Sequence, residues 1–172
     1  MAATVLLLAV AAPCVGLAQA PALETAVKAT YLYKFAAFVE WPASAFETPS
    51  APAKLCIAGE DPFGLVLAQA IRGQMIGDHP IALVHLDRVE KGAPCHILYV
   101  APSRGQTAAE ALDKVRGEPI LTITDAAADP AARGLIDFVL KDNHVRFRID
   151  ARAAGQAGLV VSSKLLSLAV AP

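Results

Sequence analysis

The sequence predicts a single-domain, layered α/β sandwich with a mixed, mainly parallel sheet and a C-terminal antiparallel hairpin. Short apolar runs of strand length alternate with helical segments through the earlier part of the chain, and this alternation is typical of parallel strands joined by helices. Near the C-terminus, two strand-like segments flank a short polar turn, which predicts the hairpin. A length of 172 residues is that of one domain.

The first part of the mature chain predicts a long helix, a buried strand and a second helix. The long helix ends at a tryptophan because the next residue is proline, which disfavours helical geometry in the residue before it. The second helix begins with Asp as N-cap and Pro in the first position. In order, these segments are the helix Leu23–Trp41, the loop Ala43–Ala53, the strand Lys54–Gly59 and the helix from Asp61 to Gly73.

The middle of the chain predicts three further strands and one helix. The helix ends at Arg116, before a glycine and a proline. Two capping boxes fit its start, one formed by Ser103 with Gln106 and the other by Thr107 with Glu110. The strands are Ile81–Leu86, His96–Val100 and Ile120–Thr124.

The C-terminal segment predicts the hairpin and two short helices. The second hairpin strand alternates apolar residues with arginines, so one of its faces is expected to contact solvent. Leu159–Val161 fits either a strand or a helix. The remaining segments are the strands Leu135–Leu140 and Val145–Ile149, a helix from Asp150 to Ala157, and a helix from Ser162 or Ser163 to Leu168.

Composition excludes several classes of protein. Lys and Arg number 15 against 16 for Asp and Glu, giving a net charge of −1 and a pI near 6.4. Nucleic-acid-binding domains and polybasic membrane-surface proteins instead need a strongly basic face. Charged residues make up 18% of the chain and apolar residues 55%, which is typical of a packed core rather than of disorder. We therefore expect no nucleic-acid partner.

Residues 1–20 are typical of a secretory signal peptide. They contain no charged residue, and Ala18–Ala20 has the A-x-A form of a cleavage site. Pro13 interrupts the apolar stretch, which is shorter than the ~20 residues of a membrane-spanning helix. A positively charged start is missing, and a buried N-terminal helix is the alternative interpretation. We expect cleavage after Ala20, which leaves an exported domain over residues 21–172 that does not span the membrane.

The mature chain contains two cysteines, Cys56 and Cys95. An even number of cysteines in an exported protein favours a disulfide, which here would close a loop of about 40 residues. Two buried free thiols are the alternative. A C-x-x-C motif is absent, which argues against a thioredoxin-like redox activity.

Motif searches find no catalytic site. Gly59 and Gly64 are spaced as in a phosphate-binding loop, but the Lys and Ser/Thr that should follow are missing. Ser163 adjoins Lys164 directly, so a helix would direct the two side chains apart. The four histidines lack the spacing of metal ligands: His79, His85, His96 and His144. We therefore expect no enzyme activity, no cofactor and no metal.

Two groups of residues are candidates for binding. Glu60 and Asp61 follow a predicted strand, at the kind of sheet edge where α/β proteins bind ligands. Lys164 joins them as a candidate ligand-binding residue, although capping and solvation explain Asp61 and Lys164 more simply. The single tryptophan, Trp41, lies with Pro42 and Phe46 at a helix end and could contact a partner. Covering the core is the alternative role for Trp41.

Six groups of residues, in their order and spacing, match a known family. They are Lys28–Phe35 continuing to Phe38–Pro42, Cys56–Gly59 with Asp61–Gly64, Cys95–Leu98, Leu121–Asp125, Val145–Phe147 and Ser162–Leu166. Each group alone is weakly specific. Together, over about residues 24–170, they resemble the YfiR family of bacterial periplasmic proteins.

The resemblance implies a non-enzymatic regulator. The best-known type of member represses an inner-membrane diguanylate cyclase of the YfiN type by binding its periplasmic region, and its release raises cyclic di-GMP and promotes biofilm formation. The resemblance also implies redox regulation through Cys56 and Cys95. The alternative function is a periplasmic small-ligand-binding module serving another sensor or receptor. We expect either the membrane partner or a second copy of the chain, as a homodimer, to contact the Trp41–Phe46 region.

Overall fold

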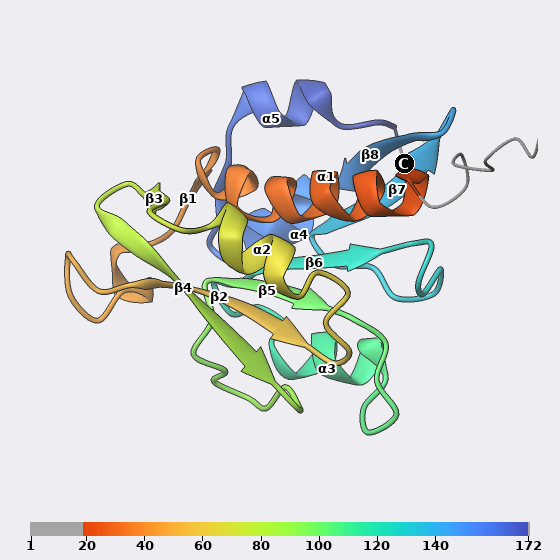
Figure 1. The fold of residues 1–172 in the computed structure, drawn as a ribbon. Helices are drawn as coiled ribbons and strands as arrows, with labels where there is room; N and C mark the ends of the chain where they lie inside the picture. Colours follow the sequence, from red (N-terminus) through yellow and green to blue (C-terminus); the bar gives the residue numbers. More distant parts are fainter. Residues whose placement is uncertain (1–18, 172) are drawn as a thin grey trace, which may run out of the picture.

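A computed structural model describes residues 19–171 as a seven-stranded sheet with helices on both faces and a separate two-stranded ribbon (Figure 1). The strand order is β3-β4-β2-β5-β6-β7-β8. The four inner pairs are parallel, whereas β3–β4 and β7–β8 are antiparallel. The predicted fold class is confirmed. Of the predicted signal peptide, residues 1–18 lie outside the described part of the chain, and residues 19 and 20 begin the first helix.

The elements have the following bounds. The helices are α1 (Gln19–Ala36), α2 (Leu65–Ala70), α3 (Ala108–Lys114), α4 (Ala151–Gln156) and α5 (Ser163–Leu168), with a 3-10 helix η1 (Ala43–Ala45). The strands are β1 (Val39–Glu40), β2 (Ala53–Ala58), β3 (Met75–Ile76), β4 (His79–Leu86), β5 (Ile97–Val100), β6 (Leu121–Asp125), β7 (Ile136–Lys141), β8 (His144–Ile149) and β9 (Val160–Val161).

Two apolar cores lie on opposite faces of the sheet, because successive strand residues point to opposite sides. On one face, Leu55 and Ile57 of β2 pack in the core that includes residues of α1 and α2. On the other face, Cys56 and Ala58 pack with residues of α3. Figure 1 shows α1 and α2 on one side of the central strands and α3 on the other. The sheet is therefore the middle layer of three.

The first helix differs from the prediction, which extended it to Trp41. The helix ends at Ala36, and Val39 and Glu40 instead pair with Val161 and Val160 as an antiparallel ribbon. Local periodicity missed this change because it depends on a partner strand more than a hundred residues away in the chain. Phe38 and Trp41 therefore follow the helix rather than extend its apolar face.

The second helix is shorter than predicted, and its N-cap is not Asp61. It begins at Leu65 after Gly64, whose φ of 49° suits glycine. Asp61 instead accepts a hydrogen bond from the Phe63 N–H at 2.8 Å, so it stabilises the turn before the helix. The two-residue strand β3 was not predicted.

Several sequence signals of caps and turns are confirmed. Thr107 and Glu110 form the capping box of α3, and Asp150 and Ser162 cap α4 and α5. Asp142 and Asn143 both have positive φ in the turn between β7 and β8, as a two-residue hairpin turn requires. The ambiguous segment before α5 contains strand β9.

A buried ion pair fixes the middle of α1 against the sheet. Lys28 is 6% exposed and donates to both Asp125, at the end of β6, and Glu24, one turn earlier in the helix. Burial lowers the pKa of Lys28, but the two carboxylates outweigh this effect and raise it above its usual value. The charged form of Lys28 is therefore the one that the fold stabilises.

Candidate functional site

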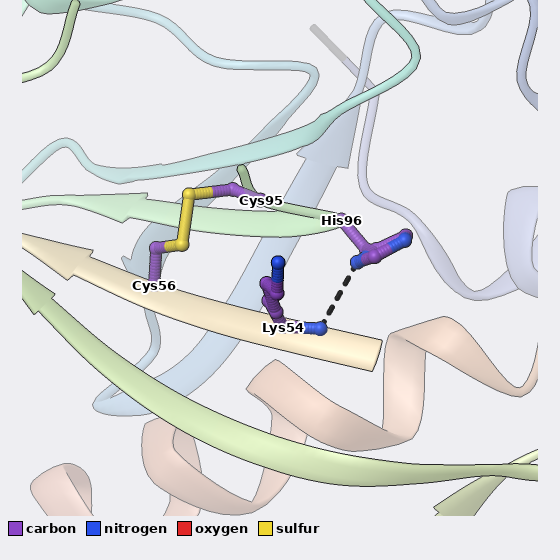
Figure 2. Close-up of a disulfide and its surroundings, with 4 residues drawn as sticks. All are labelled: Lys54, Cys56, Cys95 and His96. Carbon is purple, nitrogen blue, oxygen red and sulfur yellow. Dashed lines mark hydrogen bonds between the residues drawn. A yellow bond between two sulfur atoms is a disulfide. The ribbon is translucent and has the colours of Figure 1, made fainter. Parts of the chain in front are cut away.

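A disulfide joins β2 to the residue that precedes β5 (Figure 2). The Cα atoms of Cys56 and Cys95 lie 5.9 Å apart, within the range of disulfides. Both residues are buried in the core that contains α3. The bond that the sequence predicts is present, and it links neighbouring strands on the face opposite α1.

His96 follows the disulfide directly and connects the sheet to the loop after β1. Its Nδ1 accepts a hydrogen bond from the Lys54 N–H at 3.0 Å (Figure 2), and its Nε2 lies 3.0 Å from the carbonyl oxygen of Ala45. A ring that accepts at Nδ1 and donates at Nε2 is neutral. Burial lowers the pKa of His96, in agreement with this neutral state.

Phe46 is stacked between two histidines. Its ring centroid lies 4.3 Å from that of His96 and 3.7 Å from that of His79, and both pairs of planes are nearly parallel. The Nδ1 atom of His79 lies 2.7 Å from the carbonyl oxygen of Ala51. The loop after β1 is therefore fixed at Ala45 and Ala51 through histidine rings.

Trp41 and Pro42 lie at the point where this loop begins. Trp41 is partly buried against the main core and meets Phe46 edge to face, with centroids 6.5 Å apart. Its Nε1 is buried and has no hydrogen-bond partner among residues 19–171. Pro42 is also partly buried, and its Cγ lies 3.9 Å from the position that a Cβ at Gly158 would occupy. The loop is thus packed against the chain segment that leads into β9.

These contacts form a continuous path from the disulfide to Trp41. We call the four residues along it the His96 site: Cys95, His96, Phe46 and Trp41. A cavity of about 240 Å³ lies beside it and is lined by Lys54, Cys95 and His96, among other residues. A neutral His96 ring with both nitrogens hydrogen-bonded suits the fixing of a loop better than acid–base chemistry. In the described part of the chain, no group of three or more His, Cys, Asp or Glu side chains could hold a metal ion.

The structure does not bring the three candidate ligand-binding residues together. Glu60 is exposed, and Asp61 lies 3.0 Å from Nε2 of His85, at the carboxyl end of β2. Burial raises the pKa of Asp61, but His85 and the Phe63 N–H outweigh it and lower the pKa below its usual value. Lys164 lies on α5 with its Nζ 5.8 Å from the ring centroid of Phe38, which follows the C-terminal end of α1.

His79 and His96 were missed as site residues by sequence reasoning. Their spacing fits no metal or catalytic motif, and their role arises from Phe46, which is far from both in the chain. The only sequence signal is the position of His96 beside Cys95. That adjacency predicts a place in the fold but no contact with the loop.

Comparison with known protein families identifies a match. A family model described as YfiR/HmsC-like matches residues 25–170. This range includes every residue of the His96 site. No curated protein matches the chain. Among the residues that the structure describes, no helix is long and apolar enough to cross a membrane.

Proposed function

The chain belongs to the YfiR/HmsC-like family of periplasmic regulators, and from this premise we propose that it represses an inner-membrane diguanylate cyclase by binding the periplasmic region of that enzyme. The family match over residues 25–170 is the observation that supports the proposal. Regulation of a membrane-associated partner is the role of this family. Residues 1–20, as a cleaved signal peptide, bring the chain to that compartment, and an intact mass beginning at Pro21 checks this step.

The docking surface that we propose is the ribbon surface, formed by Trp41, Pro42 and Val160. Glu40 pairs with Val160 across the two strands, and Val160 is 60% exposed. Phe46 lies beneath Trp41 and is fixed by two histidines. Apolar groups that are already ordered lose little conformational entropy when a partner binds. These features favour recognition of another protein.

Repression follows if the protein binds the inactive enzyme more tightly than the active one, since only this difference in affinity moves the equilibrium. Deleting the gene should raise cellular cyclic di-GMP, measured by mass spectrometry of nucleotide extracts, and expression of the wild-type protein should restore the original level. Crosslinking in intact cells should recover a membrane protein with a cytoplasmic GGDEF domain. An unchanged cyclic di-GMP level after deletion would contradict the proposal.

Two substitutions test the ribbon surface. Trp41→Ala and Val160→Glu should each weaken binding to the cyclase, and loss of one aromatic contact costs ~2 kcal/mol, or about thirtyfold in affinity. Leu65→Glu is the matched control, because Leu65 is 78% exposed on α2 and belongs to neither strand of the ribbon. Thermal melting distinguishes loss of a binding contact from loss of the fold. A near-wild-type melting temperature with lost repression supports the ribbon surface as the docking site, whereas intact repression in both variants contradicts it.

A further inference from the structure

A second cavity, of about 770 Å³, lies on the face of the sheet that also carries α3. Its walls come from α3, the starts of β6 and β7, the end of β8, and α4. The volume is within the range of small-molecule sites. It shares Glu118 and Ile120 with the smaller cavity beside His96, but no residue of the His96 site lines it. The sequence alone does not predict this cavity.

Asp137 lies in this cavity with one carboxylate oxygen unpartnered. The residue is 3% exposed, and its Oδ1 accepts a hydrogen bond from the Thr124 hydroxyl at 2.9 Å. Its Oδ2 is buried and has no hydrogen-bond partner among the described residues. A buried carboxylate oxygen without a donor is costly, because it has lost its water without replacement. Burial accordingly raises the pKa of Asp137.

Arg148 lies opposite Asp137 in the β7–β8 register and is also incompletely bonded. Its Nη1 is 3.9 Å from Asp137 Oδ2, which is too long for a hydrogen bond. Its Nε is buried and has no partner within residues 19–171. An acid and a base therefore stand side by side, and each has bonding capacity that the other does not use.

The surroundings restrict which ligand fits. Apolar walls come from Leu112, Val115, Ile120, Leu135 and Ile149. The charged lining residues have both signs: Arg116 and Arg133 are basic, and Asp113, Glu118 and Asp150 are acidic. A simple anion would meet the Asp137 carboxylate, and a simple cation would meet the arginines. A molecule that has a positive and a negative group close together, attached to an apolar side chain, can bind both Asp137 and Arg148.

We propose that this cavity binds a small zwitterion of the α-amino-acid class with an apolar side chain. The ammonium group donates to Asp137 Oδ2, the carboxylate accepts from the Arg148 guanidinium, and the side chain lies along the apolar walls. The proposal does not depend on cyclase repression, since none of the three residues of the ribbon surface lines this cavity.

The test measures binding to the exported protein by calorimetry and thermal shift. The twenty common amino acids are screened first, and L-leucine and L-phenylalanine are then compared with 3-methylbutylamine, phenethylamine and 3-phenylpropionate. The zwitterions should bind, and removing either charge should weaken binding at least tenfold. If no amino acid binds at millimolar concentration, or if the single-charge analogues bind equally well, the proposal is wrong.

Variants then locate the site. Asp137→Asn and Arg148→Gln should each weaken binding at least tenfold. Arg146→Gln should not, because Arg146 is an exposed arginine on the same strand that does not line the cavity. Amide shifts on titration should concentrate at Thr122 and Gly134, which line the cavity. An equal loss of affinity in Arg146→Gln would overturn the assignment. So would amide shift changes confined to the His96 site, and this measurement on the wild-type protein holds even if one variant fails to fold.

Discussion

His96 is the residue at which the sheet, the disulfide and the loop after β1 meet. Both ring nitrogens have backbone partners, and one ring face is covered by Phe46. Since burial lowers the pKa of this ring below its usual 6.5, the folded protein keeps it neutral at pH values where the unfolded chain has bound a proton. Protonation therefore favours the unfolded chain.

The first prediction concerns this proton. The free energy of unfolding should fall as the pH drops below 6.5, by at most ~1.4 kcal/mol per pH unit, until the ring also becomes protonated in the folded state. Urea unfolding at several pH values should show a smaller slope in His96→Gln, which keeps a donor and an acceptor but does not titrate. His144→Gln, in the exposed hairpin turn, is the control. Equal slopes in all three proteins would contradict the prediction.

Residues of this kind mark where sequence reasoning stops. Asp137 interrupts an apolar run between Ile136 and Phe138, and an acid in such a run indicates a special environment. That signal predicts burial but not the cavity, because α3 and α4 supply the walls. In the same way, nothing local places Phe46 between two histidines.

Among the elements, α1 depends most on one polar contact. Lys28 reaches Asp125 across 97 positions in the chain and fixes the helix over the carboxyl end of β6. Local patterns predicted the body of this helix, most strands and the caps of α3, α4 and α5, since these depend on neighbouring residues. They missed β1 and β3, because two-residue strands form only where a partner strand is available.

The second prediction removes this contact. Lys28→Met leaves the Asp125 carboxylate buried beside an apolar side chain and should lower the free energy of unfolding by ~3–5 kcal/mol. Lys28→Met combined with Asp125→Asn should recover part of this loss, because no buried charge remains. Lys34→Met, on an exposed position of the same helix, should change little. Chemical denaturation measures all four proteins, and a loss in Lys28→Met no larger than in Lys34→Met would refute the assignment.

Across the whole molecule, the disulfide constrains the unfolded chain as well as the sheet. It closes a sequence separation of 39 residues. The chain-entropy model assigns ~4 kcal/mol to a loop of this length. The bond is also connected to Trp41, the single tryptophan, through a series of contacts. Cys95 adjoins His96, the His96 ring stacks on Phe46, and Phe46 contacts Trp41.

The third prediction follows from this position. Cys56→Ala with Cys95→Ala should lower the free energy of unfolding by up to ~4 kcal/mol, and dithiothreitol should cause a similar loss in the wild type. Reduction should also change the fluorescence of Trp41, the single tryptophan. The double variant is its own control, since the reductant should leave it unaltered. Stable, spectrally unchanged protein after complete reduction would exclude both effects.

The β1–β9 ribbon has a consequence for the order of events in the cell. Its two strands come from near opposite ends of the described chain, with Val39 paired to Val161. In the proposed export, a polypeptide still passing through the secretion channel would have Trp41 but not the strand that completes its surroundings. The ribbon surface forms only when both strands are present, so copies truncated before Val160 lack it. If this surface binds the cyclase as we propose, completion of export is a condition for being recognised.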